Sequence, residues 1–374
     1  MTKWIRWLLV FSLSTSALHA QDWLKWFGIR PIDDTISTEK SGFAVLPLLY
    51  YTPDTRLAFG AAGVYYFSIK AKTPYQKDAR LSYIQFLADY TQNRQLDIWA
   101  LWNVFTRNED YLLKGELRYR NFPDRFYGIG NATPREAAEY YSYDLKSFKY
   151  LMLKKVRSEL FIGFDLMISN EYNFKIKEGG ILDLDEITGN RGGVTSGFGA
   201  VVTYDDRDNV VNAYKGSLFE ISTYVFSNVI GSDFNFFNFN LLYQTYKELK
   251  PNNVLAFQLV TRLNTKGVPM LDMSTAGGEE ILRGYARNRF RDLNFTGFQF
   301  EYRYPLFWRL GMVAFAGVGD VYNSLNDLSL TRAKYSIGTG LRFVINPAER
   351  LNLRFDVGIG REGPQYYLMV TEAF

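Results

Sequence analysis

The chain has 374 residues, a formal net charge of +4 and no cysteine. The lack of cysteine excludes disulfide bonds and thiolate metal sites. The near balance of charge argues against a nucleic-acid partner, because nucleic-acid binding needs a strong basic excess. The only histidine, His19, lies in the first twenty residues, so histidine-based hydrolysis and histidine metal sites are not expected after export. We expect no metal, no cofactor and no enzymatic activity.

Residues 1–20 have the pattern of a secretory signal peptide. Lys3 and Arg6 precede a short apolar stretch, and small residues follow up to Ala20. We predict cleavage after Ala20, with Ala17 as the alternative. A retained anchor helix is the competing interpretation, but the apolar stretch is short for a membrane span. Cleavage removes two cations and no anion, which leaves 41 of the 43 basic residues against 39 acidic ones.

The composition of the mature chain favours a transmembrane β-barrel. Aromatic residues make up 17% of the sequence, yet no segment offers the run of about eighteen apolar residues that a membrane helix requires. Barrel strands instead alternate between lipid-facing and lumen-facing residues, with aromatic girdles at the two interfaces. A secreted, soluble β-sandwich or propeller is the competing class.

Alternation with a period of two runs through the chain and supports the barrel. In 351–360, Leu353 and Phe355 face one side while Arg354 and Asp356 face the other. Similar patterns occur in 111–120, 160–166, 237–244, 298–304 and 333–346. Charges on one face of so many strands would be costly in a dry core, but they suit a polar lumen.

We predict an all-β fold, an antiparallel transmembrane barrel of sixteen strands over 42–374, preceded by a short N-terminal periplasmic segment at 21–41. That segment is either a disordered leader or an apolar cluster on the membrane surface. The expected strands are 43–52, 55–69, 79–91, 95–106, 111–120, 143–153, 157–169, 195–205, 215–226, 236–247, 253–263, 297–304, 310–319, 333–345, 351–360 and 365–374. With the first strand running outward, the long connections follow odd-numbered strands and lie outside the cell, as in outer-membrane barrels. They are 121–142, 170–194, 264–296 and 320–332.

The connection 264–296 carries the triplet Arg283, Gly284 and Tyr285, preceded by two adjacent glycines. This triplet resembles the tip of the sixth extracellular loop in the BamA/TamA outer-membrane assembly-barrel superfamily, which includes the bacterial surface antigen family. The resemblance implies that this loop folds inward, into the lumen. Gly284 would then allow a sharp turn beside the wall, and Tyr285 would stack against lumen residues.

Other features recur in the order that the family has them. Residues 206–209 resemble its periplasmic turn after the eighth strand, 315–319 resemble a later strand, and Phe374 resembles its aromatic terminus. Gly317 departs from the pattern, because the family has a lumen-facing aspartate there. The family's periplasmic POTRA modules are also missing, since 21–41 is too short to hold one, so we expect a member that lacks them.

The resemblance also implies which side chains hold the loop, and we call Arg283, Gly284 and Tyr285 the loop-lock motif. Arginine suits a lumen site because its planar fork bonds carboxylates in two places. With the family's aspartate absent, we expect Arg283 to pair with Glu301, with Asp356 as the reserve. Arg342 is predicted to face the same lumen.

The seam between the first and last strands is the second candidate site, marked by Pro47 and Phe374. Pro47 removes a ladder donor from the first strand and is tolerated only at an edge or a bulge. A weakened seam follows if the missing donor faces the last strand. The alternative is that Pro47 directs this gap away from its partner.

We interpret the chain as a bacterial outer-membrane barrel with a role in outer-membrane biogenesis or envelope maintenance. The resemblance suggests the lipid bilayer, lipopolysaccharide and unfolded outer-membrane proteins as partners, and a weak seam suggests a homodimer. A gated or largely plugged pore, or a structural barrel, is the alternative. A membrane-embedded hydrolase is disfavoured, because the mature chain has no histidine to activate a nucleophile.

Overall fold

The computed structural model describes residues 41–52, 55–69, 82–184, 186–347 and 350–374. The predicted signal peptide lies outside the described residues, as does the N-terminal periplasmic segment except for Ser41. Apart from Ser41, the described residues lie within the predicted barrel range 42–374.

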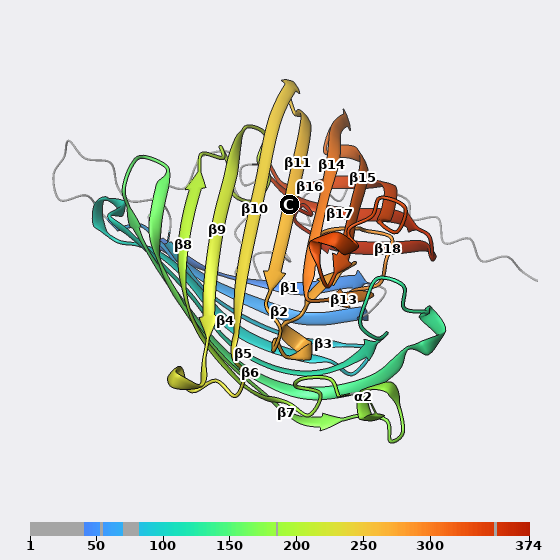
Figure 1. Ribbon diagram of the computed structural model, residues 1–374. Helices are drawn as coiled ribbons and strands as arrows, with labels where there is room; N and C mark the ends of the chain where they lie inside the picture. Colours follow the sequence, from blue (N-terminus) through green and yellow to red (C-terminus); the bar gives the residue numbers. More distant parts are fainter. Residues whose placement is uncertain (1–40, 53–54, 70–81, 185, 348–349) are drawn as a thin grey trace, which may run out of the picture.

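The barrel is a closed ring of sixteen antiparallel strands (Figure 1). Each strand pairs with the next in sequence, except that β11 pairs with β14 and β18 meets β1. The ring strands are β1 (Ser41–Thr52), β2 (Arg56–Phe67), β3 (Ser82–Thr91), β4 (Leu96–Phe105), β5 (Tyr111–Phe126), β6 (Glu139–Lys155), β7 (Leu160–Lys175), β8 (Gly193–Asp205), β9 (Gly216–Phe226), β10 (Phe236–Lys250), β11 (Asn253–Asn264), β14 (Asn294–Phe307), β15 (Leu310–Tyr322), β16 (Lys334–Asn346), β17 (Leu351–Gly360) and β18 (Gly363–Val370). The predicted sixteen-strand antiparallel barrel is confirmed.

Short elements fill the connections between the ring strands. A separate two-stranded sheet, β12 (Ser274–Ala276) with β13 (Phe290–Asp292), lies between β11 and β14. The helices are α2 (Ile181–Leu184), η1 (Arg107–Glu109), η2 (Arg135–Ala137), η3 (Asn228–Ile230), η4 (Met270–Asp272) and η5 (Leu325–Asp327). None of these helices in the described part of the chain is long and apolar enough to cross a membrane.

Burial alternates along the strands as the sequence predicts. On β14, Phe300 is 48% exposed and Tyr302 is 38% exposed, whereas Glu301 is 0% exposed between them. On β17, Phe355 lies on the exposed face and Asp356 is buried. The exposed face of the ring is therefore apolar and fits lipid, and the charged residues lie on the inner face.

Three neighbouring strands, β5, β6 and β7, run further than predicted (Figure 1). Their ends next to the connections 127–138 and 176–192 reverse the polarity of the rest of the strand: Phe122 and Phe126 are buried on the inner side, while Asn121 and Arg125 lie on the outer one. Where the outer face of a barrel strand leaves lipid and meets water, the alternation can continue with its apolar side turned inward, and these ends follow that pattern. The predicted ends at 120, 143 and 169 followed the lipid-facing pattern and were therefore too short.

The seam between β1 and β18 is the weakest pairing in the ring. β1 pairs with β2 at every residue from Ser41 to Thr52, but its register with β18 contains one pair, Tyr51 with Leu368. β18 ends at Val370, so the predicted strand 365–374 was too long at its end. Most of the β1 edge that faces β18 therefore has no strand partner among the described residues.

Candidate functional site

The triplet in the β11–β14 connection packs directly against the backbone of β17. Gly284 has a φ of 120°, and a Cβ there would lie 2.7 Å from the amide nitrogen of Gly360. A Cβ on Gly358 would similarly lie 2.5 Å from the carbonyl carbon of Arg283. Only glycine allows such an approach of two main chains at this φ, so the predicted turn at Gly284 has a structural cause.

Arg283 is fully buried and bridges two carboxylates on different strands. Its Nη2 lies 2.6 Å from Oε2 of Glu301 on β14, and its Nη1 lies 2.6 Å from Oδ2 of Asp356 on β17. The guanidinium also covers the ring of Phe315 on β15, with Cζ 3.6 Å from the ring centroid. Asp356 is therefore a simultaneous partner of Arg283, whereas it was predicted only as a reserve.

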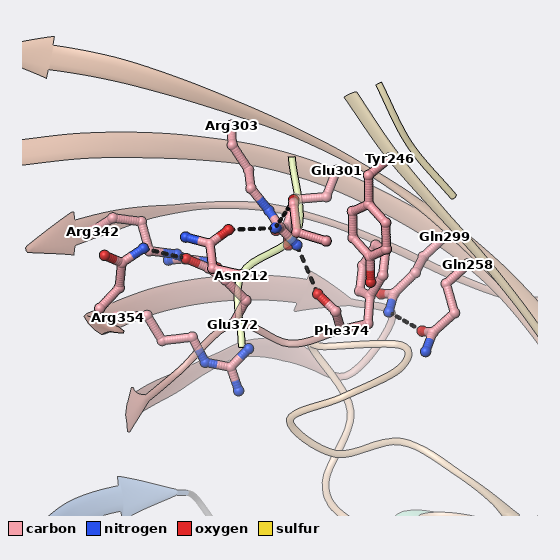
Figure 2. Close-up of polar contacts among 12 residues, drawn as sticks. Asn212, Tyr246, Gln258, Gln299, Glu301, Arg303, Arg342, Arg354, Glu372 and Phe374 are labelled. Atoms are coloured by element: carbon pink, nitrogen blue, oxygen red, sulfur yellow. Dashed lines mark hydrogen bonds and ion pairs between the residues drawn. The ribbon is translucent and has the colours of Figure 1, made fainter. Parts of the chain in front are cut away.

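Further arginines complete a network of buried charges around this bridge. Arg303 donates to Glu301 at 2.8 Å, and Arg342 contacts Asp356 at 2.5 Å. Arg342 also donates from Nε to Glu372 at 2.7 Å, a contact drawn in Figure 2. Each buried carboxylate thus has an arginine partner, which offsets the cost of taking these charges out of water. Arg342 therefore belongs to the same charge network as Arg283.

Tyrosines fasten the same turn. The hydroxyl of Tyr367 on β18 accepts a hydrogen bond from the Gly284 amide and donates one to the Tyr285 carbonyl, both at 3.1 Å. Tyr285 donates from its own hydroxyl to the Tyr335 carbonyl and packs edge-on against Phe290 of the same connection. Sequence reasoning missed Tyr367, although its inward position on the last strand was a usable signal.

Residues 371–374, which we call the inturned segment, leave the seam and enter the barrel. The Phe374 ring lies 6.2 Å from that of Tyr246 and packs beside Ala213 and Val254. Figure 2 shows Arg303 between Glu301 and Phe374, and its Nη2 donates to the main-chain oxygen of Phe374 at 2.8 Å. The expected place of Phe374 at the seam was therefore wrong, because its ring is packed against β10 and β11.

The connection 206–215 contacts the same inner-face residues. Its Asn212 accepts a hydrogen bond from Arg303 at 2.9 Å, and its Asp208 contacts Arg350 at 2.7 Å. Partial burial by itself would raise the pKa of Asp208. Hydrogen bonds from Arg350 and from the backbone amides of Tyr214 and Lys215 outweigh burial and hold this pKa below its ordinary value. The connection is thus fixed to the inner network at one point and to the rim at another.

Asp272, in the β11–β14 connection, gives a pH-dependent contact. Loss of hydration raises its pKa from 3.8 to about 6, against the attraction of Lys149 and a hydrogen bond from Thr195. Because the folded-state pKa is raised, the protonated form is favoured in the folded chain. We expect the connection to be held most firmly below about pH 4 and to loosen as the pH rises to about 6.

The rate of limited proteolysis within 264–293, measured from pH 4 to pH 8, checks this expectation. The cleavage of an unfolded peptide at each pH corrects for the pH dependence of the protease itself. Asp272→Asn should weaken the pH dependence between pH 4 and pH 6, whereas replacing the exposed Asp110 by asparagine should leave it unchanged. An unchanged pH profile in Asp272→Asn would contradict the assignment.

Among the described residues there is no group of three or more histidine, cysteine, aspartate or glutamate side chains that could hold a metal ion. The buried carboxylates of the network around Arg283, which are Glu301, Asp356 and Glu372, instead face arginines. These contacts therefore hold the β11–β14 connection and the inturned segment against the inner face of the barrel.

The chain is similar to a known protein family and to several solved structures. Residues 188–366 match the Omp85 superfamily domain. BamA from Haemophilus ducreyi lacking POTRA domains 1–3 is similar at 13% identity and a TM-score of 0.59, over 89% of this chain and 70% of that one. No curated protein sequence matches.

Two CdiB barrels are also similar. CdiB from Acinetobacter baumannii has 14% identity and a TM-score of 0.55, over 89% of this chain and 60% of its own. CdiB from Escherichia coli has 9% identity and a TM-score of 0.56, over 87% of this chain and 62% of its own. This chain thus spans less than two thirds of either CdiB chain.

Together, the closed ring and these matches define the class of protein: an outer-membrane β-barrel. More narrowly, residues 188–366 match the Omp85 superfamily domain, and the barrel resembles the barrels of BamA and CdiB.

Proposed function

We propose that this barrel assists the insertion of other proteins into the outer membrane by opening at the seam between β1 and β18. The observation that carries the proposal is the single register pair, Tyr51 with Leu368, beside the complete pairing of β1 with β2. In lipid, backbone groups without partners are costly. An incoming strand that pairs with the β1 edge would therefore be stabilised.

Three segments contact the inner face of the barrel, which favours insertion of clients sideways through the wall rather than passage through a wide pore. The β11–β14 connection, the connection 206–215 and the inturned segment all contact inner-face residues. The loop-lock motif would act here by holding the first of these against β14 and β17. A plugged pore with small conductance is the alternative, and planar-bilayer recording distinguishes it.

Unfolded outer-membrane proteins are the partners that this proposal requires. The apolar outer face would lie in the bilayer with lipopolysaccharide in its outer leaflet. A second copy of the chain is another candidate to cover the β1 edge.

A disulfide across the seam tests the proposal, because the chain contains no cysteine of its own. In Tyr51→Cys/Leu368→Cys, the two residues are cross-strand partners with a spacing that a disulfide can bridge. Vesicles carrying the reduced variant should fold a urea-denatured outer-membrane barrel about tenfold faster than empty vesicles. Oxidation should reduce the folding rate to that of empty vesicles. The heat-dependent gel shift of the added barrel protein measures this rate.

The matched control is Val225→Cys/Phe237→Cys, a register pair between β9 and β10 with both side chains exposed. Oxidation of this pair should leave the rate unchanged. Equal rates for the oxidised and reduced seam variant would refute the proposal, and channel openings without any acceleration would favour the pore.

A further inference from the structure

The inturned segment begins at a strained residue. Thr371 has a φ of 77°, a conformation that β-branched residues rarely adopt. Its amide still follows the β17 ladder, donating to the carbonyl of Asn352 at 2.8 Å, but strand β18 ends at Val370, so the positive φ of Thr371 is where the chain turns from the strand path. Strain of this kind persists only where surrounding contacts outweigh it.

The sequence would allow another path, in which β18 continues along β1. Tyr366 and Val370 lie on the exposed outer face, so by the two-residue period residue 372 would be the next side chain toward lipid. In the register of Tyr51 with Leu368, four residues further along β18 lie opposite four residues earlier on β1, which is Pro47. The continued strand would set Glu372 against lipid.

Inside the barrel, Glu372 has partners that lipid cannot offer. Its Oε2 lies 2.7 Å from Nε of Arg342, and its Oε1 accepts a hydrogen bond from Asn352 at 2.7 Å. The glutamate is buried, and Arg342 is itself held by Asp356. The same carboxylate therefore stabilises the inward path and penalises the continued strand.

We propose that Glu372 is a positioning residue that keeps the inturned segment in the lumen and thereby leaves the β1 edge unpaired. Its importance for activity rests on the proposed function, whereas its effect on the segment does not. Replacing the carboxylate with an apolar side chain should let β18 extend along β1 and close the seam.

The test uses a cysteine pair at Leu46 and Ala373, which become cross-strand partners only if the strand continues in its present register. In the Glu372→Leu background, disulfide yield should rise about fivefold or more over the same pair with Glu372 present. Hydrogen exchange of the amides in 41–50 should slow in the single variant Glu372→Leu. Equal yields and unchanged exchange in barrels that keep their heat-dependent gel shift would overturn the proposal.

Two further variants make the result specific. Glu248→Leu is the matched control, since Glu248 also pairs with a cation, Lys215, but at the end of β10; it should not change the yield. Phe374→Ala removes the ring packed on Tyr246 without changing charge. Phe374→Ala should therefore also raise the disulfide yield. It takes the place of Glu372→Leu if that variant does not fold. No increase in the disulfide yield of Phe374→Ala would also count against the proposal.

The insertion assay separates this inference from the proposed function. If Glu372→Leu closes the seam and the insertion rate stays the same, the role of Glu372 stands and the insertion proposal fails. If Glu372→Leu changes neither crosslinking nor exchange while the Tyr51–Leu368 disulfide still blocks insertion, only the role of Glu372 fails.

Discussion

Arg283→Ala is expected to release the β11–β14 connection from β14 and β17. Breaking a buried ion pair from one side costs about 3–5 kcal/mol, because the partner charges stay buried. Arg303 and Arg342 still face Glu301 and Asp356, so the cost should lie toward the lower end. Proteolysis within 264–293 should speed up, and channel openings in planar bilayers should become more frequent.

The double variant with Glu301→Gln tests the contact itself. Because Arg283 and Glu301 touch, the effects of the two changes on the free energy of loop docking should fall short of additivity by about 0.5–3 kcal/mol. Arg283→Lys should restore only part of the resistance, since one ammonium cannot span both carboxylates as the guanidinium does. Arg191→Ala, which removes a mostly exposed arginine from its pair with Asp183, is the control and should have little effect. Additive losses would mean that Arg283 and Glu301 act independently.

Gly284→Ala is expected to displace the same turn for a different reason. The new Cβ would lie 2.7 Å from the backbone of β17, and the residue would keep a φ of 120°. Strain and overpacking together should cost about 2–5 kcal/mol of docking free energy. The readout is again the rate of proteolysis within 264–293, with hydrogen exchange of the Gly284 region as a second measure.

Gly130→Ala separates the two causes. Gly130 has a similar φ of 109°, but a Cβ there would meet nothing within 4 Å. It should therefore cost only the backbone strain, about 1–3 kcal/mol. If both substitutions prove equally mild, the close approach of Gly284 to β17 does not hold the connection.

The strands could be predicted because a barrel wall imposes one simple rule on each of them. Lipid on one side and polar groups on the other require alternation, and β17 begins and ends where that pattern does, at Leu351 and Gly360. The lengths of β5 to β7 were underestimated, since no single segment marks where the outer face of a strand passes from lipid into water. The inner-face positions of Glu301, Arg342 and Asp356 followed from the same alternation.

The sequence by itself determined the class of fold, the number of strands and which side chains face inward, because these depend on patterns within one strand. It could not choose the partners across the lumen. Arg283 reaches Glu301 and Asp356 together only because the ring brings β14 and β17 around one turn of the connection. In the sequence, Glu372 is only a charged residue inside the predicted last strand, 365–374. The tertiary structure decided its path, since the groups that stabilise a buried carboxylate there, Arg342 and Asn352, lie on other strands.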